Sequence, residues 1–237
     1  MLRRRPSLVV FDLDGTLVDS APDLAYAIDE MLTRLGQPPA GEARVRGWIG
    51  NGMPMLVKRA LTGEQWPEAE PEGFAEALAL YMEIYEDNLC HRTRLYDGAL
   101  ECLQRLRQTQ IKLACVTNKH SRFTLSLLKQ IGIAHFFDAV ASGDQFVNNK
   151  PDPESLLKTA EQLGVAPSDS LMVGDSAADA QAARRAGFML ACVPYGYHGG
   201  KGVEVLLPDL ILESLAKLPG WVDSAPCQPL PAAVVGG

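Results

Sequence analysis

The sequence lacks any apolar stretch long enough to cross a membrane as a helix, which would take about 20 residues. Its first five residues include three arginines, as at the start of a signal peptide. However, Asp12 interrupts the apolar run behind them after only a few residues, which is too short for a signal sequence. We therefore expect a soluble protein that stays in the cytoplasm and has no membrane partner.

The sequence also lacks an excess of basic residues, and no segment carries a basic stripe. Its 22 Lys and Arg residues are outnumbered by 29 Asp and Glu residues, which gives a net charge of −7. A surface that binds nucleic acid is usually strongly basic, so we expect no nucleic-acid partner. An anionic ligand would have to be attracted by a few local groups rather than by the overall field.

The cysteines lack the paired spacing of a metal site. They are odd in number and scattered along the chain, at Cys90, Cys102, Cys115, Cys192 and Cys227. Cys115 and Cys192 lie inside apolar, strand-like runs, where a buried free thiol is the usual interpretation. We therefore expect reduced cysteines, as in a cytosolic protein.

Strand-like and helix-like segments alternate from residue 97 onward, and one more strand precedes them. Apolar runs typical of buried strands stand at 8–11, 111–116, 139–141, 171–173, 189–193 and 210–211. Segments with helical spacing stand at 98–108, 122–131, 153–163 and 177–186. Strands that alternate with helices predict an α/β fold with a Rossmann-like, doubly wound parallel sheet.

Residues 18–92 contain no good strand candidate. Helical spacing is found instead at 23–35, 54–61 and 72–88. We therefore predict an all-helical domain at 18–92, inserted into a core made of residues 1–17 and 93–221. The last segment, 222–237, is rich in Pro, Ala and Gly and is expected to be disordered.

The most informative stretch runs from Phe11 to Thr16. Asp12 and Asp14 follow an apolar strand two residues apart, so in an extended chain their carboxylates point the same way. Two close carboxylates repel each other unless a proton or a cation lies between them. A hard divalent ion such as Mg²⁺ would bridge them to a phosphate, which suits phosphoryl transfer. An ordinary turn at a strand end is the alternative, whereas a calcium loop is excluded because its closing glutamate is absent.

Three further polar clusters follow predicted strands, where a parallel sheet binds its ligands. The tripeptide Thr-Asn-Lys at 117–119 suits phosphate oxygens, but its threonine or asparagine would equally well cap a helix. Lys150 precedes a predicted helix, either as a site cation or as an ordinary surface lysine. Asp175 and Asp179 share a helix face, where two acids would bind a metal or merely complement the helix dipole.

The order and spacing of these four clusters resemble the phosphatases of the haloacid dehalogenase superfamily, over nearly the whole chain. The resemblance implies that Asp12 is the nucleophile that takes the phosphoryl group. It implies that Asp14 is the general acid that protonates the leaving oxygen and then the base that activates water. Thr117 and Asn118 would bind the phosphate, and Lys150 would stabilise its charge.

The same resemblance implies a Mg²⁺ cofactor. Asp12, Asp175 and the backbone carbonyl of Asp14 would hold the ion, and Asp179 would support it as a direct or an outer ligand. The aspartate at position 14 also separates this chain from two other branches of the superfamily. Ion pumps have a threonine there and dehalogenases lack the acid, so an aspartate indicates rapid release or transfer of phosphate.

The inserted helices resemble the superfamily's small helical cap, hinged near 17–20 and 96–98. Closure of such a cap excludes water and brings specificity groups over the phosphate. We therefore expect the residues that select the substrate to lie mainly in this cap.

Two stretches, 45–52 and 194–197, resemble bacterial phosphoglycolate phosphatases. They lead us to expect a small anionic phosphomonoester, 2-phosphoglycolate, as the substrate. Arg46 would reach its carboxylate, and the backbone around Gly50 and Asn51 would approach it closely.

Alternatives to this substrate stay open, because Ala178 and His198 depart from the pattern of many relatives. A phosphatase of a sugar phosphate, such as N-acetylmuramic acid 6-phosphate, is a close alternative. A sugar phosphomutase is disfavoured because its cap motif is missing, and a catalytically silent binding protein because all four clusters are present. The sequence leaves open whether the protein is a monomer or a homodimer.

Overall fold

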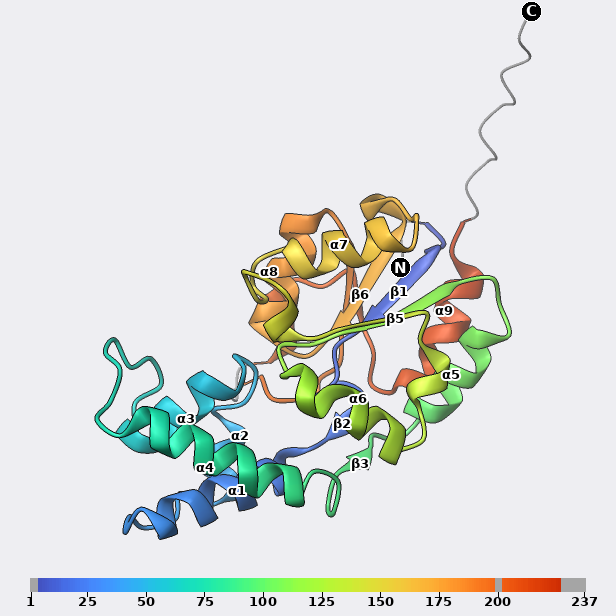
Figure 1. Ribbon diagram of the computed structural model, residues 1–237. Helices are drawn as coiled ribbons and strands as arrows, with labels where there is room; N and C mark the ends of the chain where they lie inside the picture. The colour runs from blue at the N-terminus through green and yellow to red at the C-terminus, as the bar shows by residue number, and fades with distance from the viewer. Residues whose placement is uncertain (1–3, 199–201, 227–237) are drawn as a thin grey trace, which may run out of the picture.

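The computed structural model describes residues 4–198 and 202–226 and contains a six-stranded sheet between two layers of helices (Figure 1). The strands are β1 (Leu8–Phe11), β4 (Lys112–Val116), β5 (Ala139–Ala141), β6 (Ser170–Gly174), β7 (Met189–Cys192) and β8 (Leu210–Ile211). Their order across the sheet is β5-β4-β1-β6-β7-β8, and every neighbouring pair is parallel. The predicted α/β class with a doubly wound parallel sheet is therefore confirmed.

The central strand β1 is apolar throughout because both of its faces are covered. Side chains alternate across a strand, so Leu8 and Val10 face one layer while Val9 and Phe11 face the other. The first layer contains α7 (Glu154–Gln162) and α8 (Ala177–Ala186). The second contains α5 (Ala99–Arg107), α6 (Ser121–Gln130) and α9 (Leu218–Ser224). All four β1 side chains are fully buried, which fixes the register of the strand that precedes Asp12.

Four helices between β1 and α5 pack on one another to one side of the sheet, and together we call them the helical unit (Figure 1). They are α1 (Ala21–Arg34), α2 (Glu42–Arg46), α3 (Met53–Thr62) and α4 (Phe74–Asp87). Shorter 3-10 turns occur in the rest of the chain, at Ala134–Phe136, Gly143–Gln145, Pro167–Asp169, Val203–Leu206 and Leu215–Lys217. In the described ranges, none of the helices has the length and apolar character that a membrane span requires.

A two-stranded antiparallel ribbon joins the helical unit to the sheet. It consists of β2 (Val18–Asp19) and β3 (Arg94–Leu95), which are too short for their periodicity to be recognised in the sequence. The buried carboxylate of Asp23 in α1 accepts hydrogen bonds from the N–H groups of Arg92 and Thr93 and from the Thr93 hydroxyl. The ribbon and this carboxylate lie near the expected hinges, while the domain boundaries at 17–18 and 92–93 stay a prediction.

The start of the predicted disordered tail, at residue 222, is wrong. Helix α9 continues to Ser224, and Val222 is fully buried beside Leu218 in the core. Composition pointed to disorder because 222–237 is rich in Pro, Ala and Gly, but the first three residues of this segment continue helix α9. Residues 227–237 of the predicted tail lie outside the described residues.

The cysteines of the described residues are free, at Cys90, Cys102, Cys115 and Cys192. Cys115 and Cys192 are buried in strands, as the sequence predicts. Burial raises the pKa of the Cys102 and Cys192 thiols to about 12, so both stay protonated at neutral pH.

Candidate active site

The three central strands bring the predicted clusters to one edge of the sheet. β4, β1 and β6 are neighbours, so Thr117, Asp12 and Asp175, which follow them, meet at their carboxyl ends. The order of the strands reverses at β1, since β4 and β5 lie on one side of it and β6 to β8 on the other. Such a reversal opens a crevice at the strand ends, where α/β sheets bind ligands.

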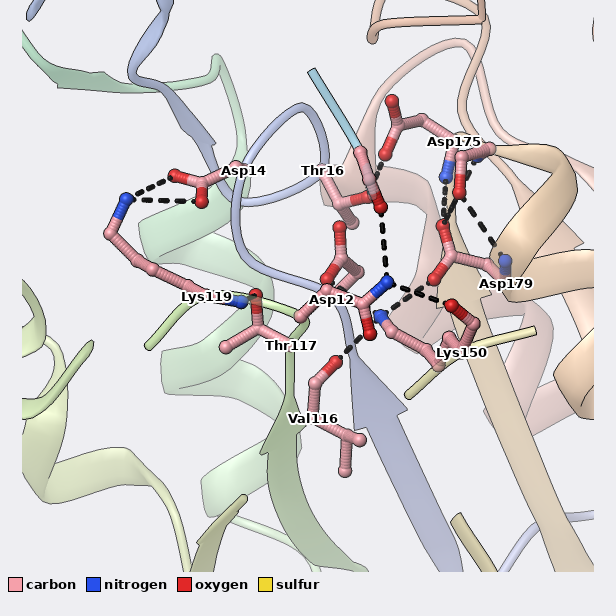
Figure 2. Close-up of polar contacts among 12 residues, drawn as sticks. Asp12, Asp14, Thr16, Val116, Thr117, Lys119, Lys150, Asp175 and Asp179 are labelled. Atoms are coloured by element: carbon pink, nitrogen blue, oxygen red, sulfur yellow. Dashed lines mark hydrogen bonds and ion pairs between the residues drawn. The ribbon is translucent and has the colours of Figure 1, made fainter. Parts of the chain in front are cut away.

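Asp12 and Lys150 form a buried ion pair at this edge (Figure 2). The Lys150 ammonium donates to Asp12 Oδ1 at 2.7 Å, to Asp179 Oδ1 at 2.7 Å and to the Val116 carbonyl at 2.8 Å. These contacts use all three N–H donors of the ammonium. Lys150 is only 4% exposed, so it is a site cation and not an ordinary surface lysine.

The buried charges shift the pKa values of this group. Burial, together with the nearby carboxylates of Asp179 and Asp14, raises the pKa of Asp12 to about 7, against the opposing effect of Lys150. Burial and the carboxylates of Asp179 and Asp12 also raise the pKa of Asp175. Burial alone would lower the pKa of Lys150, but Asp12 and Asp179 outweigh it and raise the value. The site therefore holds more negative charge than one ammonium compensates.

Asp12, Asp175 and Asp179 form a cluster whose ligand oxygens, one from each residue, all lie within 4.8 Å of one another. Asp175 is oriented by the Thr16 hydroxyl, 2.9 Å from Oδ1, and by the Tyr197 N–H, 2.5 Å from Oδ2. Three buried carboxylates with a surplus of negative charge fit a hard divalent cation, because such ions prefer oxygen ligands. The structure thus supports the predicted grouping of these three residues.

Two glycines allow the loops to approach Asp175 closely. A Cβ atom at Gly15 would lie 2.5 Å from Asp175 Oδ2, and one at Gly196 would lie 2.3 Å from Asp175 Cβ. Gly15 also has a φ of +95°, a conformation that other residues rarely adopt. A side chain at either position would displace the carboxylate from the cluster.

Asp179 is held by its own helix. Its side chain accepts hydrogen bonds from the Ser176 N–H and hydroxyl, and the Ser176 hydroxyl accepts from the Asp179 N–H. This is a capping box at the start of α8. The capping and metal-binding interpretations of Asp179 are therefore compatible, since Oδ2 serves the cap while Oδ1 faces Lys150.

The carboxylate of Asp14 does not join the cluster, although strand alternation predicted that it would point the same way as Asp12. β1 ends at Phe11 and the chain turns at Gly15, so the alternation of side chains stops before Asp14. Its carboxylate accepts from Lys119 Nζ at 3.1 and 3.2 Å (Figure 2). It also accepts from the Ser20 hydroxyl at 2.6 Å. Coordination of a metal through the Asp14 carbonyl stays a prediction.

A cavity of about 50 Å³ lies between the strand ends and the helical unit. Its polar lining comprises Asp12, Asp14, Thr117, Asn118, Lys119, His120, Lys150, Ser176 and Asp179. Its other wall comes mainly from the helical unit and includes Gly50. This volume holds a few water-sized groups, given about 10–15 Å³ for each.

The predicted substrate-binding residues of the helical unit lie in different places. Gly50 lines the cavity, and its carbonyl accepts from the Asn118 side-chain amide at 3.1 Å. Arg46 instead forms a two-pronged ion pair with Asp19, at 2.8 and 3.0 Å. Asn51 accepts from the side chain of Arg59 at 2.8 Å. Neither Arg46 nor Asn51 lines the cavity, so their role in substrate binding is a prediction that this geometry does not support.

Four polar contacts of the site were missed by sequence reasoning. Lys119 contacts both Asp14 and the hydroxyl of Tyr85 in α4. The Tyr197 hydroxyl accepts from the Ser20 N–H and donates to Asp19. The sequence placed Lys119 in a strand-end motif, which was a usable signal. It gave none for Tyr85, whose helical spacing is that of an ordinary core residue.

Comparisons with known proteins identify the family of this chain. The model of the haloacid dehalogenase-like hydrolase family matches residues 9–193. A phosphoglycolate phosphatase of Nitrosococcus oceani is 40% identical and covers 94% of this chain and 99% of its own length. One of Nitrosospira multiformis is 46% identical, over 87% and 91%. The crystal structure of a predicted phosphoglycolate phosphatase from Haemophilus somnus matches with a TM-score of 0.84 at 33% identity, over 93% of this chain and 99% of its own. This chain belongs to the family of haloacid dehalogenase-like hydrolases.

Proposed function

We propose that this protein is a Mg²⁺-dependent phosphatase that hydrolyses 2-phosphoglycolate to glycolate and phosphate through a phosphoryl group carried on Asp12. The observation that carries the proposal is the juxtaposition of Asp12 with Lys150 and two further carboxylates at the floor of a small cavity. The phosphoglycolate phosphatases of Nitrosococcus oceani and Nitrosospira multiformis, which match most of this chain, support the choice of substrate.

The proposed reaction has two steps. In the first, a carboxylate oxygen of Asp12 attacks phosphorus, the ester bond breaks, and the leaving oxygen takes a proton from Asp14. In the second, Asp14 takes a proton from water as it attacks the phosphorus of the acyl phosphate, which releases phosphate and restores Asp12. Lys150 orients the nucleophile, while Ser20 and Lys119 orient Asp14.

Asp12, Asp175 and Asp179 would hold the metal ion. When bound, Mg²⁺ supplies positive charge that stabilises the phosphoryl oxygens as negative charge develops on them. Thr117 and Asn118 line the same cavity. The Thr117 hydroxyl is the side-chain group offered to the phosphate, because both N–H groups of the Asn118 side chain donate to carbonyls. These carbonyls belong to Gly50 and Lys150, so Asn118 ties the helical unit to the floor of the site.

The size of the cavity supports a small leaving group. A space of about 50 Å³ holds only a few water-sized groups, so the helical unit would have to move for any phosphate ester, and farther for a hexose or an amino sugar than for a two-carbon acid. The apolar wall and the two lysines suit a compact anion. We therefore favour phosphoglycolate over sugar phosphates, including N-acetylmuramic acid 6-phosphate.

A panel of phosphomonoesters with purified protein and Mg²⁺ tests the substrate. We expect kcat/KM for phosphoglycolate to exceed that for ethyl phosphate by roughly 10²-fold or more, because a buried polar site strongly rejects an analogue that lacks the matching group. The measurement is the initial rate of phosphate release over a range of concentrations. A preference for a hexose or amino-sugar phosphate would overturn the proposed substrate and leave the phosphatase mechanism standing.

A second prediction concerns the dependence of metal binding on pH. Asp12 has a folded-state pKa of about 7, above the value of about 3.9 expected for an unfolded chain. A raised carboxyl pKa stabilises the fold at low pH, and this contribution is lost as the pH rises through 7. A metal binds only the ionised carboxylate, so Mg²⁺ must compete with a proton below that pKa. We therefore expect Mg²⁺ to raise the Tm more at pH 8 than at pH 5.5.

Thermal unfolding with excess chelator and with Mg²⁺, at both pH values, makes this measurement without substrate. The Asp175→Asn variant is the control, since it should lose most of the shift at pH 8 by removing one carboxylate of the cluster. An equal or larger shift at pH 5.5 in the unaltered protein would contradict the prediction.

A further inference from the structure

Two lysines with buried ammonium groups line the cavity, and they differ in the groups that they contact. Lys150 spends its three N–H donors on Asp12, Asp179 and the Val116 carbonyl. The side chain of Lys119 is 5% exposed and contacts two groups, the Asp14 carboxylate and the Tyr85 hydroxyl. The Lys119 ammonium bonds both oxygens of Asp14 and the Tyr85 hydroxyl, so a further acceptor would take over one of the two N–H groups that face Asp14.

Tyr85 adds a second donor beside Lys119. Its hydroxyl oxygen accepts from Lys119 Nζ at 2.7 Å, and its ring lies 4.8 Å from the same nitrogen. Within the part of the chain that the structure describes, the hydroxyl donates to no recorded acceptor. Burial raises the pKa of Tyr85 well above its usual value, so the phenol keeps its proton and is able to donate it in a hydrogen bond.

The surroundings of this pair are apolar. The cavity wall next to it consists of Leu24, Ile49, Met53, Leu56, Tyr81 and Phe123. An anionic group that enters such a wall needs a cation and a hydrogen-bond donor, because burial without them is costly. Lys119 and Tyr85 supply both.

The contact between Lys119 and Asp14 determines which part of the substrate Lys119 and Tyr85 are able to reach. Asp14 serves the leaving oxygen in the proposed reaction, and Lys119 bonds Asp14 directly. A group one or two carbons beyond that oxygen is therefore within reach of Lys119. The carboxylate of a two-carbon hydroxy acid lies at this distance from its ester oxygen.

We infer that Lys119, together with Tyr85, binds the carboxylate of the leaving group and so selects phosphate esters of short hydroxy acids. This inference rests on the proposed function, and it assigns to Lys119 the role that sequence analysis predicted for Arg46. Arg46 is engaged by Asp19 and Glu42 outside the cavity, whereas Lys119 lies inside it. Lys119 is thus a specificity-determining residue that also orients Asp14.

The test compares Lys119→Met with Lys158→Met, a matched change on an exposed face of α7 outside the cavity. Each variant and the unaltered protein are assayed with phosphoglycolate and with ethyl phosphate. We expect the ratio of the two kcat/KM values to fall at least roughly 10-fold in Lys119→Met and to stay unchanged in Lys158→Met. Tyr85→Phe should lower the same ratio by a smaller factor.

The ratio separates specificity from the general loss that a disturbed Asp14 would cause, since that loss affects both esters. If the unaltered protein itself does not distinguish the two esters, the proposed substrate is overturned. If it does distinguish them and Lys119→Met keeps the full ratio, only the present inference is overturned.

A binding measurement covers the case in which Lys119→Met has no measurable turnover. Glycolate added with Mg²⁺ and inorganic phosphate should raise the Tm of the unaltered protein and of Lys158→Met. It should leave the Tm of Lys119→Met unchanged, while phosphate alone still raises it. Stabilisation of Lys119→Met by glycolate to the same extent as the unaltered protein would overturn the inference.

Discussion

Asp12→Asn is expected to abolish the hydrolysis of every phosphomonoester while the protein stays folded. The amide has nearly the same size and still accepts a hydrogen bond from Lys150, but it lacks the charge of a nucleophile. Loss of a nucleophile typically lowers kcat by a factor on the order of 10⁴–10⁶. Because Asp12 serves the phosphoryl group and not the leaving group, the loss should be similar for phosphoglycolate and for p-nitrophenyl phosphate.

The measurement is phosphate release by protein purified away from host phosphatases, with the melting temperature as the check on folding. Asp87→Asn is the matched control, since it makes the same chemical change on the exposed end of α4. Activity of Asp12→Asn above roughly 1% of the unaltered protein would assign the nucleophile to another residue.

The fold was predictable because its strands are recognised from their apolar runs and from the polar residues that follow these runs. The run Leu8 to Phe11 is apolar on both faces, which is the signature of a buried strand, and a polar residue follows at once. The same reasoning located Asp175 at the end of β6 and the 117–119 motif at the end of β4. Parallel strands present these ends at one edge, so much of the floor of the site followed from sequence alone.

The partners of each charged side chain were not predictable, because they are set by contacts between distant segments. Lys150 pairs with Asp12, which is 138 positions away in the sequence, and Lys119 bonds Tyr85, which is 34 positions away. Arg46 looked available for a substrate because nothing in its own segment reveals Asp19 as its partner. Periodicity describes one element at a time, whereas an ion pair depends on how two elements pack.

The carboxylates of Asp12 and Asp14 point in different directions for a local reason, and the sequence shows only part of that reason. Strand alternation holds only while the chain is extended, and β1 ends one residue before Asp12. Gly15 signalled the turn but not where the alternation would stop. The two acids consequently lie in different environments, one beside Lys150 and one beside Lys119, which suits two different roles in a reaction (Figure 2).

Lys150→Met is expected to lower kcat by roughly 10²–10³-fold, the usual cost of removing one group that stabilises charge in the transition state. Its burial also predicts a loss of stability, which a surface lysine would not show. Removing one partner of a buried ion pair typically costs about 3–5 kcal/mol, because the remaining charge is left uncompensated. Here Asp12 and Asp179 would both lose their shared partner.

The loss of stability should depend on pH and on the metal. At pH 6 Asp12, whose pKa is raised to about 7, is able to take up a proton, so the variant should be less destabilised there than at pH 8. Mg²⁺ should recover part of the stability at pH 8 by replacing the lost positive charge, but not the rate, since the ammonium is absent from the nucleophile. Urea unfolding at both pH values, with and without Mg²⁺, measures these changes in stability. Lys158→Met is again the control. A Lys150→Met protein with a rate within about threefold of the unaltered one and an unchanged stability at pH 8 would show that the ion pair seen at the strand ends serves neither catalysis nor the fold.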